Sequence, residues 1–155
     1  MVTGSEPWKN SSDDCTKVVD GNNATFFDGV GNGWVQIDLG KVRRVDAVSF
    51  VPRAGYEYRA ADGIFEVSAD GVNWKRIKQI GSVPTFAVNY ITDLGGNNMI
   101  RYVKYYVPDG KPENGVNKDS VYCCNIAEIR IYGPDGPVKG DLNEDGSVSA
   151  ADMII

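Results

Sequence analysis

The stretch GWVQIDLGKVRRVDAVSFVPR, residues 33–53, decides the fold. It holds two runs rich in Val, Ile and Phe, 34–40 and 44–52. Side chains of the second run fall into two alternating sets, Val45, Ala47 and Ser49 in one and Asp46, Val48 and Phe50 in the other. This alternation is typical of antiparallel strands that place one face on a core. We therefore expect two antiparallel strands here.

Similar stretches along the chain predict further strands at 64–70, 73–80, 85–94, 100–108 and 126–133. Gly, Asn, Asp and Pro separate them, and Asp70-Gly71 is a turn signal between two of them. No segment before residue 147 has a sustained helical period. Strands at this spacing predict an all-β fold, an antiparallel β-sandwich.

The length of 155 residues suits one domain with a full core and a short appendage. The net charge of −5 belongs mostly to the end of the chain, because no base follows Lys139. Residues 1–140 carry 17 acids against 16 bases. A nearly neutral body without a basic run argues against nucleic acid or an anionic membrane as the main partner.

No stretch reaches the roughly 18 apolar residues of a transmembrane helix, and MVTGSEPW lacks the pattern of a signal peptide. The chain has no histidine, and its cysteines, Cys15, Cys123 and Cys124, match no zinc spacing. Zinc chemistry and any mechanism that needs an imidazole base are therefore excluded.

The end of the chain, GDLNEDGSVSAADMII (140–155), carries the spacing of an EF-hand calcium loop. Its ligand positions are Asp141, Asn143, Asp145, Ser147 and Asp152, with Gly146 at the turn. Only the first residues of the helix that should follow the loop are present, so we expect weak calcium binding or none. The proline-rich PDGPVK (134–139) predicts a linker between this loop and a sandwich domain at 1–133.

Three stretches carry a resemblance to a known family: KVVDGNNAT (17–25), the stretch at 33–53, and NIAEIRIYG (125–133). They resemble the discoidin-like jelly roll, a galactose-binding-domain-like fold, of coagulation-factor C domains and family 32 carbohydrate-binding modules. The tail resembles the first half of a dockerin, which docks an enzyme onto a cellulosome scaffold by binding a cohesin. Together they imply a binding module cut from a secreted, extracellular, cellulosome-associated glycoside hydrolase. Cohesin binding is expected only of a complete dockerin.

The resemblance implies a structural Ca²⁺ site that ties the first loop to the last strand. The matching positions are the backbone carbonyls of Lys17 and Ala127 and the side chains of Asp20, Asn22, Thr25 and Glu128. Six oxygen donors with two carboxylates suit this hard cation. The alternative is that DGNNAT is only an Asx-rich turn.

This implied site also bears on the cysteines, since Cys15 and Cys124 lie close in sequence to Lys17 and Ala127. Three alternatives remain open: a disulfide from Cys15 to Cys123 or Cys124, a vicinal Cys123–Cys124 disulfide, or free thiols.

A sugar ring offers an apolar C–H face and a rim of hydroxyls, so its receptor needs an aromatic platform and planar polar groups on loops. In the family this site lies on loops near the calcium. Arg53 matches the family's sugar-binding arginine, with an ion pair to Glu57 as the alternative role. The expected carbohydrate-binding residues are Phe26, Arg53, Tyr56, Tyr58, Arg59, Asp62, Tyr122 and Cys123.

We therefore expect a monomeric, non-catalytic module that binds plant cell-wall polysaccharide or oligosaccharide, with β-mannan as the first candidate. Family members that bind galactose supply a histidine, which this chain lacks. The alternatives are a module for galactose or another terminal sugar, a discoidin-type membrane or receptor binder, and a small glycosidase or lyase. The last of these needs two carboxylates across a cleft, and the sequence indicates no such pair.

Overall fold

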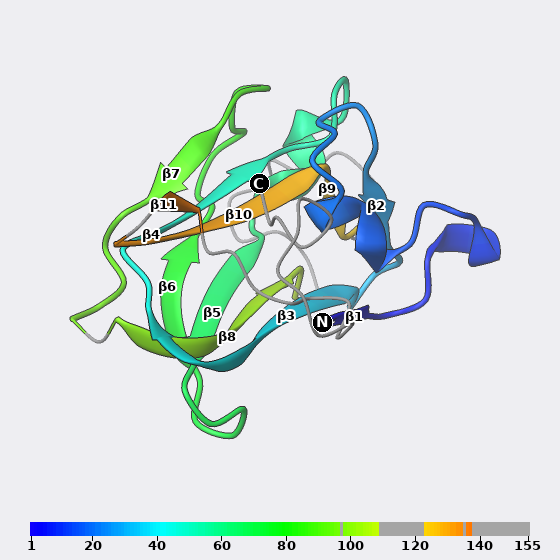
Figure 1. Ribbon diagram of the computed structural model, residues 1–155. Helices are drawn as coiled ribbons and strands as arrows, with labels where there is room; N and C mark the ends of the chain where they lie inside the picture. Colours follow the sequence, from blue (N-terminus) through cyan, green and yellow to red (C-terminus); the bar gives the residue numbers. More distant parts are fainter. Residues whose placement is uncertain (97, 109–122, 135, 138–155) are drawn as a thin grey trace.

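Two antiparallel β-sheets pack face to face around a shared core, with a two-stranded ribbon beside them (Figure 1). The computed structural model describes residues 1–96, 98–108, 123–134 and 136–137. The predicted all-β antiparallel sandwich is confirmed. Within the described residues the only helical elements are short 3₁₀ turns, and no helix is long and apolar enough to cross a membrane.

The larger sheet has five strands in the order β1-β3-β8-β5-β6, and the smaller has four in the order β11-β10-β4-β7. The larger sheet consists of β1 (Val2–Gly4), β3 (Trp34–Arg44), β8 (Met99–Tyr106), β5 (Ile64–Ser68) and β6 (Lys75–Gln79). The smaller consists of β11 (Gly136–Pro137), β10 (Glu128–Gly133), β4 (Ala47–Val51) and β7 (Asn89–Ile91). The ribbon pairs β2 (Phe27–Asp28) with β9 (Asn125–Ile126), and the 3₁₀ turns are η1 (Trp8–Asn10), η2 (Cys15–Val19) and η3 (Glu57–Ala60).

The core follows from the alternation along the strands. Val35, Tyr105 and Phe65 are register partners on β3, β8 and β5, and all three are fully buried. The ring of Phe65 lies 4.9 Å from that of Tyr105 and 5.2 Å from that of Phe50 on the opposite sheet. The next residue along each strand points to the outer face of the sheet.

Several strand boundaries differ from the sequence expectation. The stretch 126–133 divides at Ala127, because the chain there leaves its pairing with β2 and joins β4, with the Ala127 N–H donating to the Val51 carbonyl. The expected strand at 85–94 is reduced to β7, since the Asn89 side chain donates to the carbonyls of Thr85 and Ala87 in a local turn. The short strands β1, β2 and β11 were not predicted.

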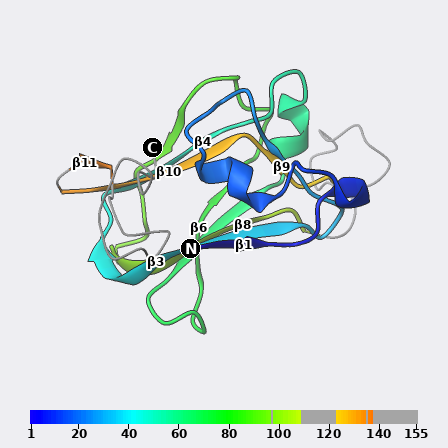
Figure 2. The same ribbon diagram turned by 45° about the vertical axis from the view of Figure 1, so that its right-hand side comes forward.

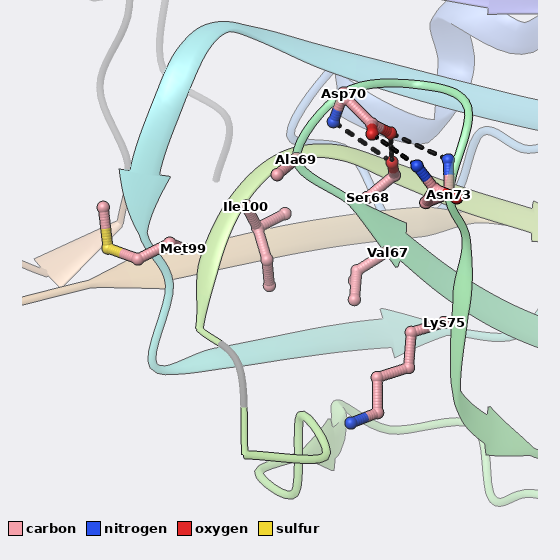
Figure 3. A pocket seen from close by; sticks show the side chains of 8 residues that line it. All are labelled: Val67, Ser68, Ala69, Asp70, Asn73, Lys75, Met99 and Ile100. Atoms are coloured by element: carbon pink, nitrogen blue, oxygen red, sulfur yellow. Dashed lines mark hydrogen bonds between the residues drawn. The ribbon is translucent and has the colours of Figure 1, made fainter.

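The predicted Asp70-Gly71 turn joins β5 to β6, and Figure 3 shows its side chains beside a shallow hollow. The Asp70 carboxylate accepts from the backbone N–H groups of Val72 and Asn73, both at 2.8 Å, and from the Asn73 side chain at 2.7 Å. These bonds favour the charged form and lower the pKa of Asp70. Gly71 has φ +77°, which glycine tolerates at no steric cost. The polar groups here are engaged in forming the turn.

Candidate functional site

A cluster of polar side chains forms where β2 pairs with β9, on the side of the sandwich that also carries η3 (Figure 2). Asp28 and Asn125 face each other in the register of this ribbon. Arg53 follows β4, and Arg59 lies in η3. The loop between β4 and β5 thus brings two guanidinium groups onto a pair of strand-end residues.

Asn125 is the centre of this arrangement. Its Oδ1 accepts from Nη1 of Arg53 and from Nη1 of Arg59, each at 3.0 Å, and its Nδ2 donates to Oδ1 of Asp28 at 2.8 Å. The Asp28 carboxylate lies 3.1 Å from Nη1 of Arg53 and 3.9 Å from that of Arg59. The Asp28, Arg53 and Arg59 side chains are between 16% and 19% exposed, so they remain reachable from solvent. Among these residues, the two guanidinium groups share one carboxylate, that of Asp28.

Aromatic rings hold these guanidinium groups in place. The guanidinium carbon of Arg53 lies 3.8 Å from the ring centroid of Phe26 and 4.3 Å from that of Tyr56. That of Arg59 lies 4.4 Å from the same Tyr56 ring. Tyr56 is 38% exposed, and its ring centroid lies 6.2 Å from that of Tyr58. We call Asp28, Arg53, Tyr56, Arg59 and Asn125 the arginine cluster.

The structure brings Phe26, Arg53, Tyr56, Tyr58 and Arg59 together, as the proposed sugar site requires. The remaining candidates are placed differently. Asp62 is only 3% exposed, and its N–H donates to the Ile80 carbonyl, so its carboxylate is not presented at the surface. Cys123 is half-buried, and Tyr122 lies outside the described residues.

The expected alternative partner of Arg53 was wrong. The Glu57 carboxylate accepts from the Gly55 N–H at 2.9 Å, whereas Arg53 pairs with Asp28. Sequence reasoning missed both Asp28 and Asn125. Asp28 could have been expected, because two arginines in one short loop need a nearby acid to balance their charge.

The predicted calcium loop begins at Asp20, which follows η2. Asp20 accepts from the Asn22 N–H at 2.9 Å and from the Thr25 hydroxyl at 2.7 Å, while the Asn22 carboxamide oxygen accepts from the Ala24 N–H at 3.0 Å. These are Asx-turn contacts, so the local structure of the loop agrees both with a calcium site and with a plain Asx-rich turn. Arg130 of β10 donates to Asn23 at 2.8 Å and joins the loop to the last strand.

Glu128 is the residue that an Asx turn leaves unexplained. It is fully buried, and neither carboxylate oxygen has a hydrogen-bond partner among the described residues. The N–H groups of Gly21 and Asn22 approach it without reaching hydrogen-bonding geometry. Burial, reinforced by the Asp20 charge and opposed by Arg130, raises the pKa of Glu128 to about 8.

An orphaned buried carboxylate beside a second one fits a cation with oxygen ligands. The described residues contain no group of three or more His, Cys, Asp or Glu side chains that could hold a metal, so any ion here would also need carbonyl, amide or hydroxyl oxygens. The loop supplies these groups at Asn22 and Thr25.

No disulfide joins Cys15, Cys123 and Cys124 in the structure, which agrees with the third of the alternatives left open by the sequence. Cys124 is fully buried, and this burial raises the pKa of its thiol far above its ordinary value.

Comparison with known protein families identifies the family of this chain. The family model described as F5/8 type C domain matches residues 2–129, a range that includes the arginine cluster and Glu128. The chain belongs to the F5/8 type C domain family. None of the curated proteins matches it.

Several solved structures share this fold. CBM62 from Clostridium thermocellum Xyl5A is 31% identical, with a TM-score of 0.68 over 88% of this chain and 94% of that one. The module CpGH89CBM32-5 from Clostridium perfringens, in complex with GalNAc-β-1,3-galactose, is 15% identical, with a TM-score of 0.64 over 86% and 94%. The CBM32 of AlyQ, in complex with 4,5-unsaturated mannuronic acid, is 18% identical, with a TM-score of 0.65 over 85% and 93%.

The last two identities show the shared fold alone. The expected discoidin-like fold is thus confirmed, whereas membership of family 32 stays a prediction. The dockerin-like loop at 140–155 lies outside the described residues and stays a prediction as well.

Proposed function

We propose that this domain is a non-catalytic carbohydrate-binding module and that the arginine cluster is its sugar site. The observation that carries the proposal is the single Asn125 oxygen that accepts from both Arg53 and Arg59. This contact fixes two planar donor groups next to the exposed ring of Tyr56. A receptor for a sugar ring needs this combination of an aromatic face and oriented polar groups.

Each component has a defined role toward a sugar. A guanidinium carries five N–H donors, and the contacts of Arg53 to Asn125 and Asp28 both use Nη1. We expect the other donors of Arg53 to contact ring hydroxyls, and the exposed Tyr56 ring to cover the C–H face. Because Asp28 and Asn125 orient the arginines before a ligand arrives, little side-chain entropy is lost on binding.

Similar structures support a carbohydrate ligand without specifying one. Two of them hold the sugars named above, and another is described as a pectin binding carbohydrate binding module. Our first candidate is β-mannan or a manno-oligosaccharide of the plant cell wall, because the dockerin-like tail suggests an enzyme that degrades plant cell walls. A second candidate is a polysaccharide that contains uronic acid, because the guanidinium groups of Arg53 and Arg59 can pair with carboxylates in a bidentate geometry.

We further propose that a structural Ca²⁺ is held beside η2. The expected donors are the backbone carbonyls of Lys17 and Ala127 and the side chains of Asp20, Asn22, Thr25 and Glu128. The buried Glu128 carboxylate without a partner supports this assignment. Such an ion would fix the loop that leads into Phe26 and β2, and thereby the position of Asp28.

We propose that the domain is secreted and targets an attached glycoside hydrolase to its substrate. A small site of this kind binds with a Kd between about 1 μM and 1 mM, or roughly −8 to −4 kcal/mol. That affinity suffices when tethering raises the effective concentration of the enzyme at an insoluble wall.

Affinity electrophoresis in gels that contain galactomannan, xylan, galactan or pectin tests the sugar site. The wild type should be retarded in at least one gel, and Arg53→Ala should be retarded much less in that gel. Arg44→Ala is the matched control, because Arg44 is 60% exposed and its pair with Asp46 is a surface contact. Equal retardation of wild type and Arg53→Ala would refute the site. Co-sedimentation of the wild type with liposomes, without any retardation, would favour the membrane binder.

A further inference from the structure

The outer face of the five-stranded sheet carries an open hollow of about 410 Å³ that the arginine cluster does not use. Its lining residues are Asn32, Trp34, Gln36, Glu66, Lys104 and Tyr106. They come from the loop before β3 and from β3, β8 and β5, which run side by side in Figure 1. None of them belongs to the arginine cluster.

Strand register makes this surface a fixed feature. Trp34 lies directly opposite Tyr106, which forms an aromatic row, and Gln36 and Glu66 lie on either side of Lys104, which forms a polar row. The intervening residues on each strand point into the core. The two rows therefore cannot turn inward without a register shift that would expose the core. Trp34 is 37% exposed, although a large apolar ring is normally covered where possible.

The polar row is held rigidly. Lys104 Nζ lies 3.1 Å from the Glu66 carboxylate and 3.9 Å from the ring centroid of Trp74. The Tyr106 hydroxyl donates to the other Glu66 oxygen at 3.1 Å. The floor of the hollow thus presents a carboxylate, an ammonium group and a phenol that are already oriented, next to the side-chain amides of Asn32 and Gln36.

We infer that this hollow is a second glycan-binding site, which takes the interior of a hydroxyl-rich polysaccharide chain. Trp34 and Tyr106 provide flat apolar surface for the C–H faces of sugar rings, and the amide and charged groups provide donors and acceptors for hydroxyls. Because the hollow is open, it does not enclose a chain end as a closed pocket does, and it suits the interior of a chain.

The composition disfavours other occupants. The centre of a protein interface is depleted in charged residues, whereas Glu66 and Lys104 lie in the middle of this floor. A nucleic acid would need a strong excess of positive charge, whereas here Lys104 pairs with Glu66 and Arg76, the register partner of Glu66, adds one positive charge beside the hollow. Two sites on one module go beyond the proposed function, because they would allow the domain to hold one polysaccharide chain at two points or to bridge two chains.

The test uses affinity electrophoresis of the full chain in galactomannan, xylan, galactan and pectin gels. Trp34→Ala should raise the apparent Kd about tenfold or more in a gel that retards the wild type, and Trp34→Phe should recover part of the loss. Trp8→Ala is the matched control, since Trp8 is 50% exposed and lies outside the hollow, and it should migrate like the wild type. Thermal unfolding of each variant identifies any loss that is due to misfolding.

Combination with Arg53→Ala separates the two sites. Residual retardation of Arg53→Ala that disappears in the Arg53→Ala, Trp34→Ala double variant supports a second site. If Trp34→Ala is retarded like the wild type while Arg53→Ala migrates freely, the inference is overturned and the arginine cluster stands. It is also overturned if Trp34→Ala changes only the sedimentation coefficient, because the hollow would then join two copies of the chain.

Discussion

Glu128→Gln should abolish the stabilisation that we expect Ca²⁺ to give this domain. Glu128 is fully buried, and both its carboxylate oxygens lack hydrogen-bond partners among the described residues. Asp20 lies close enough to oppose its ionisation. A divalent cation would compensate both carboxylates, whereas glutamine offers only a neutral amide to the ion.

The size of the effect follows from linkage. An ion that binds only the folded state stabilises it by about 2.7 kcal/mol at one hundred times its Kd. At about 2–4 °C of Tm per kcal/mol for a chain of this size, calcium should raise the wild-type Tm by roughly 5–10 °C. In EGTA, Glu128→Gln should unfold at the same temperature as the wild type or higher, because a buried carboxylate without a partner costs more than a buried amide.

Differential scanning calorimetry in calcium chloride and in EGTA measures both effects. The tail contains a second candidate calcium loop, so Asp141→Asn combined with Asp145→Asn serves as the control and should keep the full shift. The reasoning fails if the wild-type Tm does not respond to calcium, or if Glu128→Gln responds as strongly as the wild type.

Three further predictions concern the fold. Asp38→Asn should cost at most about 1 kcal/mol at neutral pH, because both carboxylate oxygens accept from the partly exposed Arg101, at 2.8 and 2.9 Å. Arg101 lowers the pKa of Asp38, so this stabilisation is present above the unfolded pKa of about 3.9 and is lost as the pH falls through the folded pKa. Urea unfolding of the wild type and of Asp38→Asn should therefore give the same free energy at low pH, and a difference that stays constant with pH would contradict this. Phe65→Ala should cost about 3–5 kcal/mol in urea unfolding, since its fully buried ring packs on two others; a loss below 1 kcal/mol would show a poorly packed core. Gly63→Ala should lower the Tm by several degrees, because its Cβ would lie 2.6 Å from the Tyr105 ring; an unchanged Tm would show that the ring can move.

The sandwich itself was predictable from the chain. Alternation in the stretch 33–53 identifies β3 and β4, and in β3 the buried residues are those on the apolar side of the pattern. In β4 both faces are covered, since Val48 to Val51 are all buried. The jump at Ala127 from one pairing partner to another was not predictable, because the run of apolar residues continues across it. The local sequence pattern indicates which residues favour a strand, whereas long-range packing decides which strands pair with each other.

The arginine cluster was predictable only in part. Arg53, Tyr56 and Arg59 stand out because charged and aromatic residues crowd a short loop. Asp28 and Asn125 lie on two-residue strands, which are too short to show a period, and 97 positions of sequence separate them. Trp34 and Tyr106 alternate with buried neighbours, but only the register of β3 and β8 reveals that they form one surface.

The claim that the arginine cluster binds sugar is tested most directly by NMR titration of the labelled protein with a soluble oligosaccharide from a retarding polysaccharide. The guanidinium Nε–H signals of Arg53 and Arg59 and the side-chain amide signals of Asn125 report on the site itself. The account predicts that these signals shift together and saturate at one Kd, while the Nε–H signal of Arg44 stays in place. Saturable binding that leaves the three cluster residues unshifted would contradict it.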